Sequence, residues 1–573
     1  MRTNRLIILL IAFVLILQFQ AQATKCIPFL QQKGTATQLI LDKKPFIILG
    51  GELGNSSAAS IYDIERIFPK LKRMGLNTVL VPAYWDLIEP EEGKYDFSLI
   101  EKVINQAREN KLKIIFLWFG AWKNSMSCYA PLWFKQNYEE YPRAYTKEGK
   151  PLEIASSFSE NVLFADNRAF SQLMKYIKLI DAHENTVIMM QIENEIGMLE
   201  NARDYSEKAN ILFKKGVPKT LLDYLHNKKQ ELHPFILKKW GEQGFKREGT
   251  WEEVFGYDLY TDELFMAWSY AQYVEELAKS GKSIHNIPMY VNAAMNSRNR
   301  QPGEYPSAGP LAHLIDVWHC GAPSIDFLAP DLYDKGFSGW VAQYKLHNNP
   351  LFIPEVKLGE NNGVQAFYVF GEHDAIGYSP FSIESGSDDP NGQQVKAYSK
   401  LKELMPILTK YQGEEVMNGL LFDQEDKERI IFHDDLKITC RHYFTLPWDS
   451  RAKDGSEWPE GGGILIRLAA DEYLVTGSGI VIEFEKVGEE KNIESKDLGE
   501  DGFFQQGGTE IKQSSWSGGL RAGIGTVDEI SIDEKGSFNY IRRLNGDQTH
   551  QGRHVRISVD DFSILHVKLY EYK

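Results

Sequence analysis

The sequence predicts a closed (β/α)₈ barrel followed by a smaller all-β domain that resembles a sandwich. Eight short apolar runs alternate with stretches of helical periodicity, and polar residues gather directly after several of these runs. After about Gly413 the pattern changes, because only short alternating runs remain, separated by Gly, Asp and Asn. A doubly wound open sheet is the main alternative to the barrel.

The eight apolar runs are predicted to be the strands of the barrel. Each is four to seven residues long and is followed by Gly, Pro, Asn or an acidic residue, as buried parallel strands often are. Their ranges are 46–49, 78–81, 113–119, 187–192, 288–291, 327–330, 351–354 and 366–370.

Amphipathic stretches between these runs predict the helices. In the first, apolar side chains recur at positions 64, 67, 68 and 71, and Gly75 ends the pattern. A long insertion, 198–260, separates the fourth strand from the next strong helix. The predicted helices are 61–74, 99–107, 169–182, 264–278 and 394–410.

The C-terminal part is predicted to be a separate β-rich domain. Its clearest strands are 436–440, 463–468, 480–484 and 564–569, and the region 488–516 is predicted to form loops. The predicted domains are therefore a barrel over 27–412 and an all-β domain over 413–573.

The N-terminus is typical of a secretory signal peptide. Arg2 and Arg5 precede twelve apolar residues, 6–17, and Ala21-Gln22-Ala23 offers small residues for cleavage. The apolar run is too short for a comfortable membrane span. We predict a signal peptide over residues 1–23, export to the periplasm or the exterior, and no membrane span.

Composition excludes several classes of protein. The 573 residues carry a formal net charge of −15 without a block of Lys or Arg, which argues against a nucleic-acid partner. No clustered Cys and His and no phosphate-binding loop occurs, so we predict neither a metal nor a cofactor. The pairing of the four cysteines stays open: Cys26, Cys128, Cys320 and Cys440.

The fourth predicted strand runs into two acids and an amide, Glu193, Asn194 and Glu195. Buried strands that end in acids are costly unless the acids face a cleft and act there. The seventh strand also ends in an acid, Glu355. Because the strands of a parallel barrel end at one rim, we expect Glu195 and Glu355 to face each other across its mouth.

Two opposed carboxylates are what the cleavage of a glycosidic bond with retention requires, at a separation of about 5–5.5 Å. Asn194 beside Glu195 offers an amide for a sugar 2-hydroxyl, which favours Glu195 as general acid/base. Glu355 is then the nucleophile. Tyr333, after the sixth strand, is predicted to donate a hydrogen bond to Glu355 and to keep it ionised.

The same residues resemble glycoside hydrolase family 35, the β-galactosidases. The similarity spans about 41–383, and 542–547 resembles the β-rich domain that follows the barrel in a bacterial subgroup. The resemblance implies acid/base Glu195, nucleophile Glu355, and sugar contacts from Glu193, Asn194 and Tyr84. The motifs that carry it are Gln191–Gly197 with Pro354-Glu355, Met74–Val79, and the two blocks 84–90 and 92–97.

Two stretches depart from the family pattern. The first strand ends in Gly51-Glu52-Leu53-Gly54-Asn55, where the family has His and Tyr. The loop after the third strand, 119–124, keeps only Asn124 as a counterpart of the Asn and Glu that contact the sugar. The resemblance therefore supports the catalytic pair more directly than the specificity for galactose.

We expect an exported retaining glycoside hydrolase that removes terminal β-D-galactosyl residues from oligo- or polysaccharides. A β-glycosidase for glucose or arabinose is the alternative within the class, and a non-catalytic glycan-binding protein is the alternative outside it. The expected partner is a carbohydrate, and association into a homo-oligomer stays open.

Overall fold

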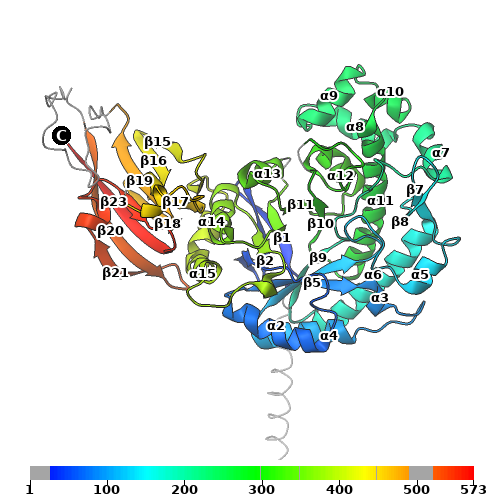
Figure 1. Cartoon of the computed structure of the whole chain (residues 1–573), viewed down its shortest axis with the longest axis horizontal. Helices are drawn as coiled ribbons and strands as arrows, with labels where there is room; N and C mark the ends of the chain where they lie inside the picture. The colour runs from blue at the N-terminus through cyan, green and yellow to red at the C-terminus, as the bar shows by residue number, and fades with distance from the viewer. Residues whose placement is uncertain (1–25, 297–298, 347–348, 447, 489–519) are drawn as a thin grey trace, which may run out of the picture.

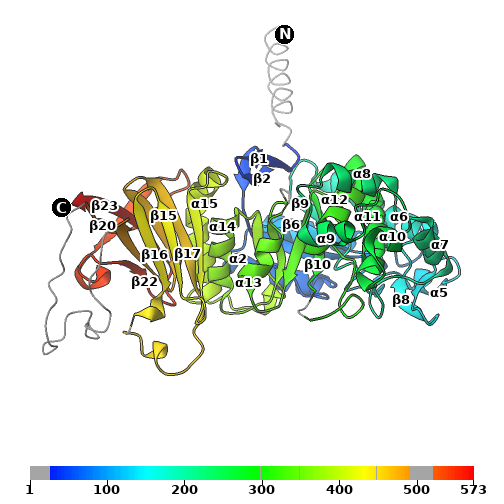
Figure 2. The same ribbon diagram turned by 90° about the horizontal axis from the view of Figure 1, so that it is seen from above.

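A computed structural model of the chain describes residues 26–296, 299–346, 349–446, 448–488 and 520–573. The predicted signal peptide and residues 489–516 of the predicted loop region lie outside the described residues. A barrel and a β-rich part lie side by side along the long axis of the molecule (Figures 1 and 2). None of the described helices combines the length and the apolar character that crossing a bilayer requires. The four cysteines are unpaired.

Eight parallel strands form the barrel, in the order β4-β13-β12-β11-β10-β9-β6-β5. The two ends of this sheet meet through backbone hydrogen bonds, from Leu53 N–H to Leu80 O and from Leu80 N–H to Gly51 O, each 3.0 Å. The predicted (β/α)₈ barrel is therefore confirmed. The strands are β4 (Ile48–Leu49), β5 (Thr78–Tyr84), β6 (Lys113–Phe119), β9 (Val187–Gln191), β10 (Met289–Ala294), β11 (Phe327–Leu332), β12 (Phe352–Val356) and β13 (Gly377–Pro380).

Five of the outer helices overlap the predicted ranges 61–74, 99–107, 169–182, 264–278 and 394–410, and the other outer helices were not predicted. In α2, the hydroxyl of Ser60 accepts the N–H of Asp63, and the predicted apolar face is buried. The outer helices are α2 (Ile61–Arg73), α3 (Trp85–Ile88), α4 (Ser98–Asn110), α6 (Glu160–Asp181), α11 (Leu259–Ile284), α12 (Ile315–Gly321), α13 (Phe337–Gln343), α14 (Asn362–His373) and α15 (Gln393–Tyr411).

Two insertions extend the C-terminal face of the barrel. The first follows β6 and contains α5 (Leu132–Gln136) and the hairpin β7 (Arg143–Tyr145) and β8 (Pro151–Ala155). The second, predicted as 198–260, is helical. Its helices are α7 (Glu207–Lys215), α8 (Lys219–Asn227), α9 (Pro234–Glu242) and α10 (Trp251–Phe255).

The prediction of the eighth strand is wrong. Residues 366–370 lie inside α14, and the eighth strand is β13, which follows that helix. Helix α14 lies between the barrel and the β-rich part, where Phe367 stacks on Phe562 at 5.7 Å between ring centroids. A helix that is buried on both sides has a nearly continuous apolar run, and such a run does not differ in periodicity from a buried strand.

An antiparallel sheet of three strands precedes the barrel and was not predicted. It consists of β1 (Phe29–Lys33), β2 (Ala36–Leu41) and β3 (Lys44–Phe46). The Nδ2 of Asn185, just before β9, donates to Asp42 Oδ1 at 2.9 Å. This sheet therefore lies at the N-terminal ends of the barrel strands, away from the predicted site.

The β-rich part is a two-layered sandwich, as predicted. One sheet has the order β14-β17-β18-β23-β20-β21 and the other β15-β16-β19-β22. Helix α15 and β14 flank the predicted domain boundary at 413, which stays a prediction. The strands are β14 (Met417–Phe422), β15 (Glu428–His433), β16 (Leu436–His442), β17 (Gly461–Ala469), β18 (Glu472–Ser478), β19 (Ile480–Lys486), β20 (Arg521–Ile532), β21 (Phe538–Leu544), β22 (Val555–Ile557) and β23 (Ser563–Tyr572).

Candidate active site

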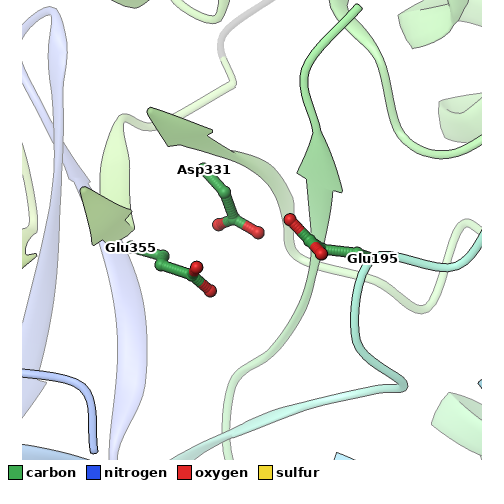
Figure 3. Close-up of side chains that lie close together, drawn as sticks. All are labelled: Glu195, Asp331 and Glu355. Carbon is green, nitrogen blue, oxygen red and sulfur yellow. The ribbon is translucent and has the colours of Figure 1, made fainter. Parts of the chain in front are cut away.

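Three carboxylates meet at the C-terminal rim of the barrel (Figure 3). Glu195 follows β9, Asp331 lies in β11 and Glu355 lies in β12, and one carboxylate oxygen of each lies within 4.8 Å of the others. The structure thus brings the predicted pair, Glu195 and Glu355, together. Asp331 was not predicted, although it follows an apolar run as the other two acids do.

The strand register explains the position of Asp331. In the parallel pair β11 and β12, Asp331 is the register partner of Glu355. Asn292 in β10 connects the group to Glu195, because its Oδ1 accepts the N–H of Glu195 at 3.0 Å and its Nδ2 donates to Asp331 Oδ2 at 2.6 Å. Asp331 and Glu355 are therefore held within strands, and Asn292 in the strand between β9 and β11 links Glu195 to them.

Glu195 is fixed by the loop after β6 as well as by Asn292. The Nδ2 of Asn124 donates to the Glu195 carboxylate, and the N–H of Ser125 donates to the Glu195 carbonyl oxygen at 3.1 Å. Asn124, predicted as a sugar contact, thus contacts the acid itself. Glu195 has a φ of +45°, in the left-handed region that non-glycine residues seldom adopt and that is common at functional sites.

Glu355 accepts a hydrogen bond from the hydroxyl of Tyr333, as predicted. Its side chain is buried, and its Oε2 has no hydrogen-bond donor within the described part of the chain. Burial and the charge of Glu195 raise the pKa of Glu355 to about 7, while Lys123 and the Tyr333 hydroxyl act to lower it. Glu355 therefore takes up a proton near neutral pH.

A fourth carboxylate, Glu52, lies three residues after β4 and was noted in the sequence only as a departure from the family pattern. Its side chain is fully buried. Burial, and next the charge of Glu355, raise the pKa of Glu52 well above its usual value. Burial and the neighbouring acids, Glu355 first, raise the pKa of Asp331 in the same direction.

Lys123 supplies positive charge to this group of acids. It is buried, and its ammonium lies 5.1 Å from the centroid of the Phe119 ring. Its charge acts to lower the pKa of both Glu52 and Glu355. If all four carboxyls were ionised, the five groups would carry a net charge of −4 + 1 = −3, which is costly inside a protein. Some of the acids must therefore carry protons.

The structure does not bring Glu193 to this group. Its Oε2 accepts the N–H of Trp122 at 2.8 Å, and it lies beside Asp166, which the Trp118 Nε1–H and the Tyr273 hydroxyl bind. Burial and the charge of Asp166 raise the pKa of Glu193 well above its usual value. Alternation in a strand predicts the same direction for Glu193 and Glu195, but the positive φ of both residues, +56° and +45°, breaks that alternation.

The two other predicted sugar contacts lie at the same end of the barrel. Asn194 is fully buried, and neither atom of its amide has a hydrogen-bond partner among the described residues. Tyr84 ends β5, and its hydroxyl accepts the N–H of Ala58 at 3.3 Å. Asn194 thus has its full hydrogen-bonding capacity left for a ligand, whereas Tyr84 has already used part of its capacity.

Carboxylate oxygens at this spacing are also ligands that Mg²⁺ or Ca²⁺ accepts. In this group, however, the Lys123 ammonium already supplies positive charge beside Glu52 and Glu355. A second cation bound to these acids would be repelled by that charge. The arrangement therefore favours acid/base and nucleophilic chemistry by carboxyl groups.

Comparison with known families supports a glycosidase-like barrel. The model of glycoside hydrolase family 42, described as "Beta-galactosidase", matches residues 59–254, and a model described as "Domain of unknown function (DUF5597)" matches residues 395–556. The first match includes Glu195 but ends before Glu355. The prediction of a β-galactosidase family agrees with this match, but the prediction of family 35 is wrong, because the matching model is that of family 42.

Curated relatives give the same description. A β-galactosidase of Xanthomonas manihotis is 26% identical over 219 residues, which are 37% of this chain and 34% of that protein. The mouse β-galactosidase-1-like protein 3 is 28% identical over 190 residues, 32% of this chain and 27% of that protein. The chain thus spans about a third of the length of the curated relatives it matches.

Solved β-galactosidase structures are similar to the chain at low sequence identity. The cold-adapted enzyme of Rahnella sp. R3 has 15% identity and a TM-score of 0.43, with 66% of this chain and 58% of that chain covered. Gan42B of G. stearothermophilus, a family 42 β-galactosidase solved as a catalytic mutant, has 14% identity and a TM-score of 0.43, with 63% and 57% covered.

Proposed function

We propose that this chain is a retaining exo-β-galactosidase, which removes terminal β-D-galactosyl residues from oligo- or polysaccharides. The observation that carries the proposal is the opposed pair Glu195 and Glu355 at the rim of the barrel, with carboxylate oxygens within 4.8 Å. Retention requires carboxyl groups about 5–5.5 Å apart, whereas inversion requires room for a water between them. The family match over 59–254 supports the galactoside as substrate.

In the first step, the ionised Glu355 attacks the anomeric carbon of the bound sugar. A glycosyl–carboxylate bond forms as the glycosidic C–O bond breaks, and Glu195 gives its proton to the leaving oxygen. The Tyr333 hydroxyl, which binds Glu355, stabilises the carboxylate before the attack.

In the second step, water attacks the same carbon. Glu195, now ionised, takes a proton from that water, the bond to Glu355 breaks, and Glu355 leaves as a carboxylate. Asn194 is buried beside Glu195 with an amide that the described residues do not use. We assign it to the sugar 2-hydroxyl, where a hydrogen bond strengthens in the transition state.

The proposal includes export. The charged start, the apolar run 6–17 and the small residues at 21–23 support a signal peptide that is removed after residue 23. The N-terminal sequence of the protein from periplasm or culture medium tests this point. A chain that begins at Thr24 is expected, and a chain that retains residues 1–23 contradicts export by this route.

A panel of nitrophenyl glycosides tests the specificity. We expect turnover of the β-galactoside and little of the β-glucoside or α-arabinoside. If only another glycoside is hydrolysed, the proposed specificity for galactose is wrong, but the assignment of Glu195 and Glu355 as the catalytic pair is unaffected. If the purified chain binds sugars but cleaves none of the glycosides, the non-catalytic alternative replaces the proposal.

The pH dependence of kcat/KM follows from Glu355. Catalysis requires this carboxyl in its ionised form, and its pKa is raised to about 7. We therefore expect kcat/KM to fall as the pH falls through about 7, by about tenfold for each further pH unit. Initial rates at low substrate between pH 5 and pH 9 measure this, and a profile that stays flat down to pH 5 contradicts the prediction.

Tyr333→Phe removes one donor to Glu355 and leaves the ring in place. We expect the acidic limb of kcat/KM to move to higher pH, because the lost hydrogen bond had stabilised the ionised form. The maximal rate is expected to fall by about 10- to 100-fold, the usual cost of a hydrogen bond to a charged group. If the rate falls but the acidic limb of the kcat/KM profile stays at the same pH, Tyr333 contacts the sugar rather than stabilising the Glu355 carboxylate.

A further inference from the structure

Glu52 occupies a rigid place in the wall of the site. Its N–H donates to Pro380 O at 2.9 Å, and its carbonyl oxygen accepts the N–H of Ile383 at 3.0 Å. On the other side, the N–H of Leu53 donates to Leu80 O at 3.0 Å. The backbone of Glu52 is thus held between β13 and β5 where the barrel closes, and it cannot shift to take the carboxyl out of the site.

The carboxyl of Glu52 is 0% exposed, and neither of its oxygens accepts a hydrogen bond from a donor in the described part of the chain. It lies within hydrogen-bonding reach of Glu355. The Oε2 of Glu355 also has no donor among the described groups. Two buried carboxyls in contact repel each other when both are ionised, and they bind each other when one carries a proton.

We infer that Glu52 is a neutral acid whose O–H donates to Oε2 of Glu355, so that the nucleophile is held by Glu52 on one oxygen and by Tyr333 on the other. Glu52 is therefore a positioning residue, since it acts through Glu355. The inference rests on the proposed function for the role of Glu355, but the protonation of Glu52 does not depend on it.

The surroundings decide which of the two acids carries the proton. Glu355 accepts the Tyr333 hydroxyl and is stabilised as an anion by Lys123. The charge of Lys123 also acts on Glu52, but Glu52 accepts no hydrogen bond from any donor in the described part of the chain. The anion belongs on the carboxyl that already has a donor, and the proton belongs on the one that has none.

Charge balance supports the same assignment. The proposed reaction requires Glu195 with its proton and Glu355 without one. If Glu52 and Asp331 are both neutral, the four carboxyls together carry −1, which Lys123 balances. Any further ionisation leaves a net negative charge among groups that are all at most 5% exposed, and burial opposes this strongly.

Two variants of the full chain test the role in positioning. Glu52→Gln keeps the shape, the neutrality and an N–H donor, and we expect kcat/KM on a nitrophenyl galactoside to stay within about threefold of wild type. Glu52→Leu lacks the donor, and we expect a loss of about 10- to 100-fold with the acidic limb moved to higher pH. If Glu52→Gln loses as much as Glu52→Leu, Glu52 acts as an anion and the inference is wrong.

The stability of the fold tests the protonation without any turnover. A carboxyl with a raised pKa in the folded state stabilises the fold below its ordinary value of about 4.5, and this stability is lost as the pH rises toward the folded pKa. In Glu52→Gln the side chain at this position does not titrate, so the variant lacks this loss of stability. The ratio of the unfolding equilibrium constant of Glu52→Gln to that of wild type should therefore fall by up to about tenfold for each pH unit above 4.5.

Glu460→Gln is the matched control. Burial raises the pKa of Glu460 to about 7, but Glu460 accepts a hydrogen bond from Gln365 at 2.9 Å, outside the catalytic group. It should show the stability effect up to about pH 7 without any change in the pH profile of kcat/KM. A stability difference between Glu52→Gln and wild type that does not change with pH would overturn the inference. If the wild-type protein has no galactosidase activity, the proposed function is wrong. The pH dependence of stability then still tests whether Glu52 carries a proton.

Discussion

Glu355→Gln is expected to lose turnover of a β-galactoside by at least about 10⁴-fold, while galactose still binds. The amide keeps the size of the side chain and accepts the Tyr333 hydroxyl, but it cannot form the glycosyl–carboxylate bond. The loss corresponds to about 5.5 kcal/mol of activation free energy. Steady-state rates and calorimetric titration with galactose measure the two parts of this prediction.

Glu360→Gln is the control for the same chemical change. Glu360 lies five residues beyond Glu355 and is exposed, so its substitution should alter neither turnover nor binding. Thermal unfolding of both variants checks that they fold. If Glu355→Gln keeps the turnover of wild type, Glu355 is not the nucleophile and the roles of the two acids must be reassigned.

Glu195→Ala is expected to have the second-largest effect, and its size should depend on the leaving group. General acid catalysis contributes about 10²- to 10⁴-fold, so hydrolysis of an oligosaccharide, whose leaving alcohol needs a proton, should fall by that factor. A dinitrophenyl galactoside leaves without a proton, and its first step should be nearly unaffected. Comparison of the two substrates in burst and steady-state kinetics measures this dependence.

Azide separates the roles of the two acids more sharply. In Glu195→Ala, azide needs no general base, so it can attack the glycosyl-enzyme and should restore turnover with a β-galactosyl azide as product. If Glu195 were the nucleophile, azide would attack the substrate directly from the opposite face and give the α-product. The anomer found by NMR therefore decides between the two assignments.

Several features of the barrel were predictable because they depend on local pattern. The strands at 113–119 and 187–192 are apolar runs bounded by turn residues, and they agree with β6 (Lys113–Phe119) and β9 (Val187–Gln191) within one residue. The opposition of Glu195 and Glu355 followed from the barrel itself, because parallel strands present their carboxyl ends at one rim.

Helix α14 shows where local pattern is insufficient. Its residues contact the barrel on one side and the sandwich on the other, as the stacking of Phe367 on Phe562 shows. Burial on both sides removes the polar face that distinguishes a helix from a buried strand. The eighth strand, β13, has only four residues, Gly377–Pro380, and it lacks a run long enough to predict.

The site shows the same limit. Alternation along a strand would point Glu193 and Glu195 the same way, but the positive φ of both residues sends Glu193 toward Trp122 and Glu195 toward Glu355. Glu52 and Asp331 follow apolar runs as many structural acids do. Only their burial beside Glu355 distinguishes them.

The sequence by itself determined the class of the fold, the sandwich that follows the barrel, and the two acids that face each other, since periodicity and strand ends are local properties of the chain. Only the tertiary structure decided how many acids share the site, that Asp331 and Glu52 lie beside Glu355, and that Glu193 turns away. Those features depend on backbone torsions, burial and contacts between residues far apart in the chain. The protonation of each carboxyl depends on the same features, because it is set by neighbours that only the closed barrel brings together.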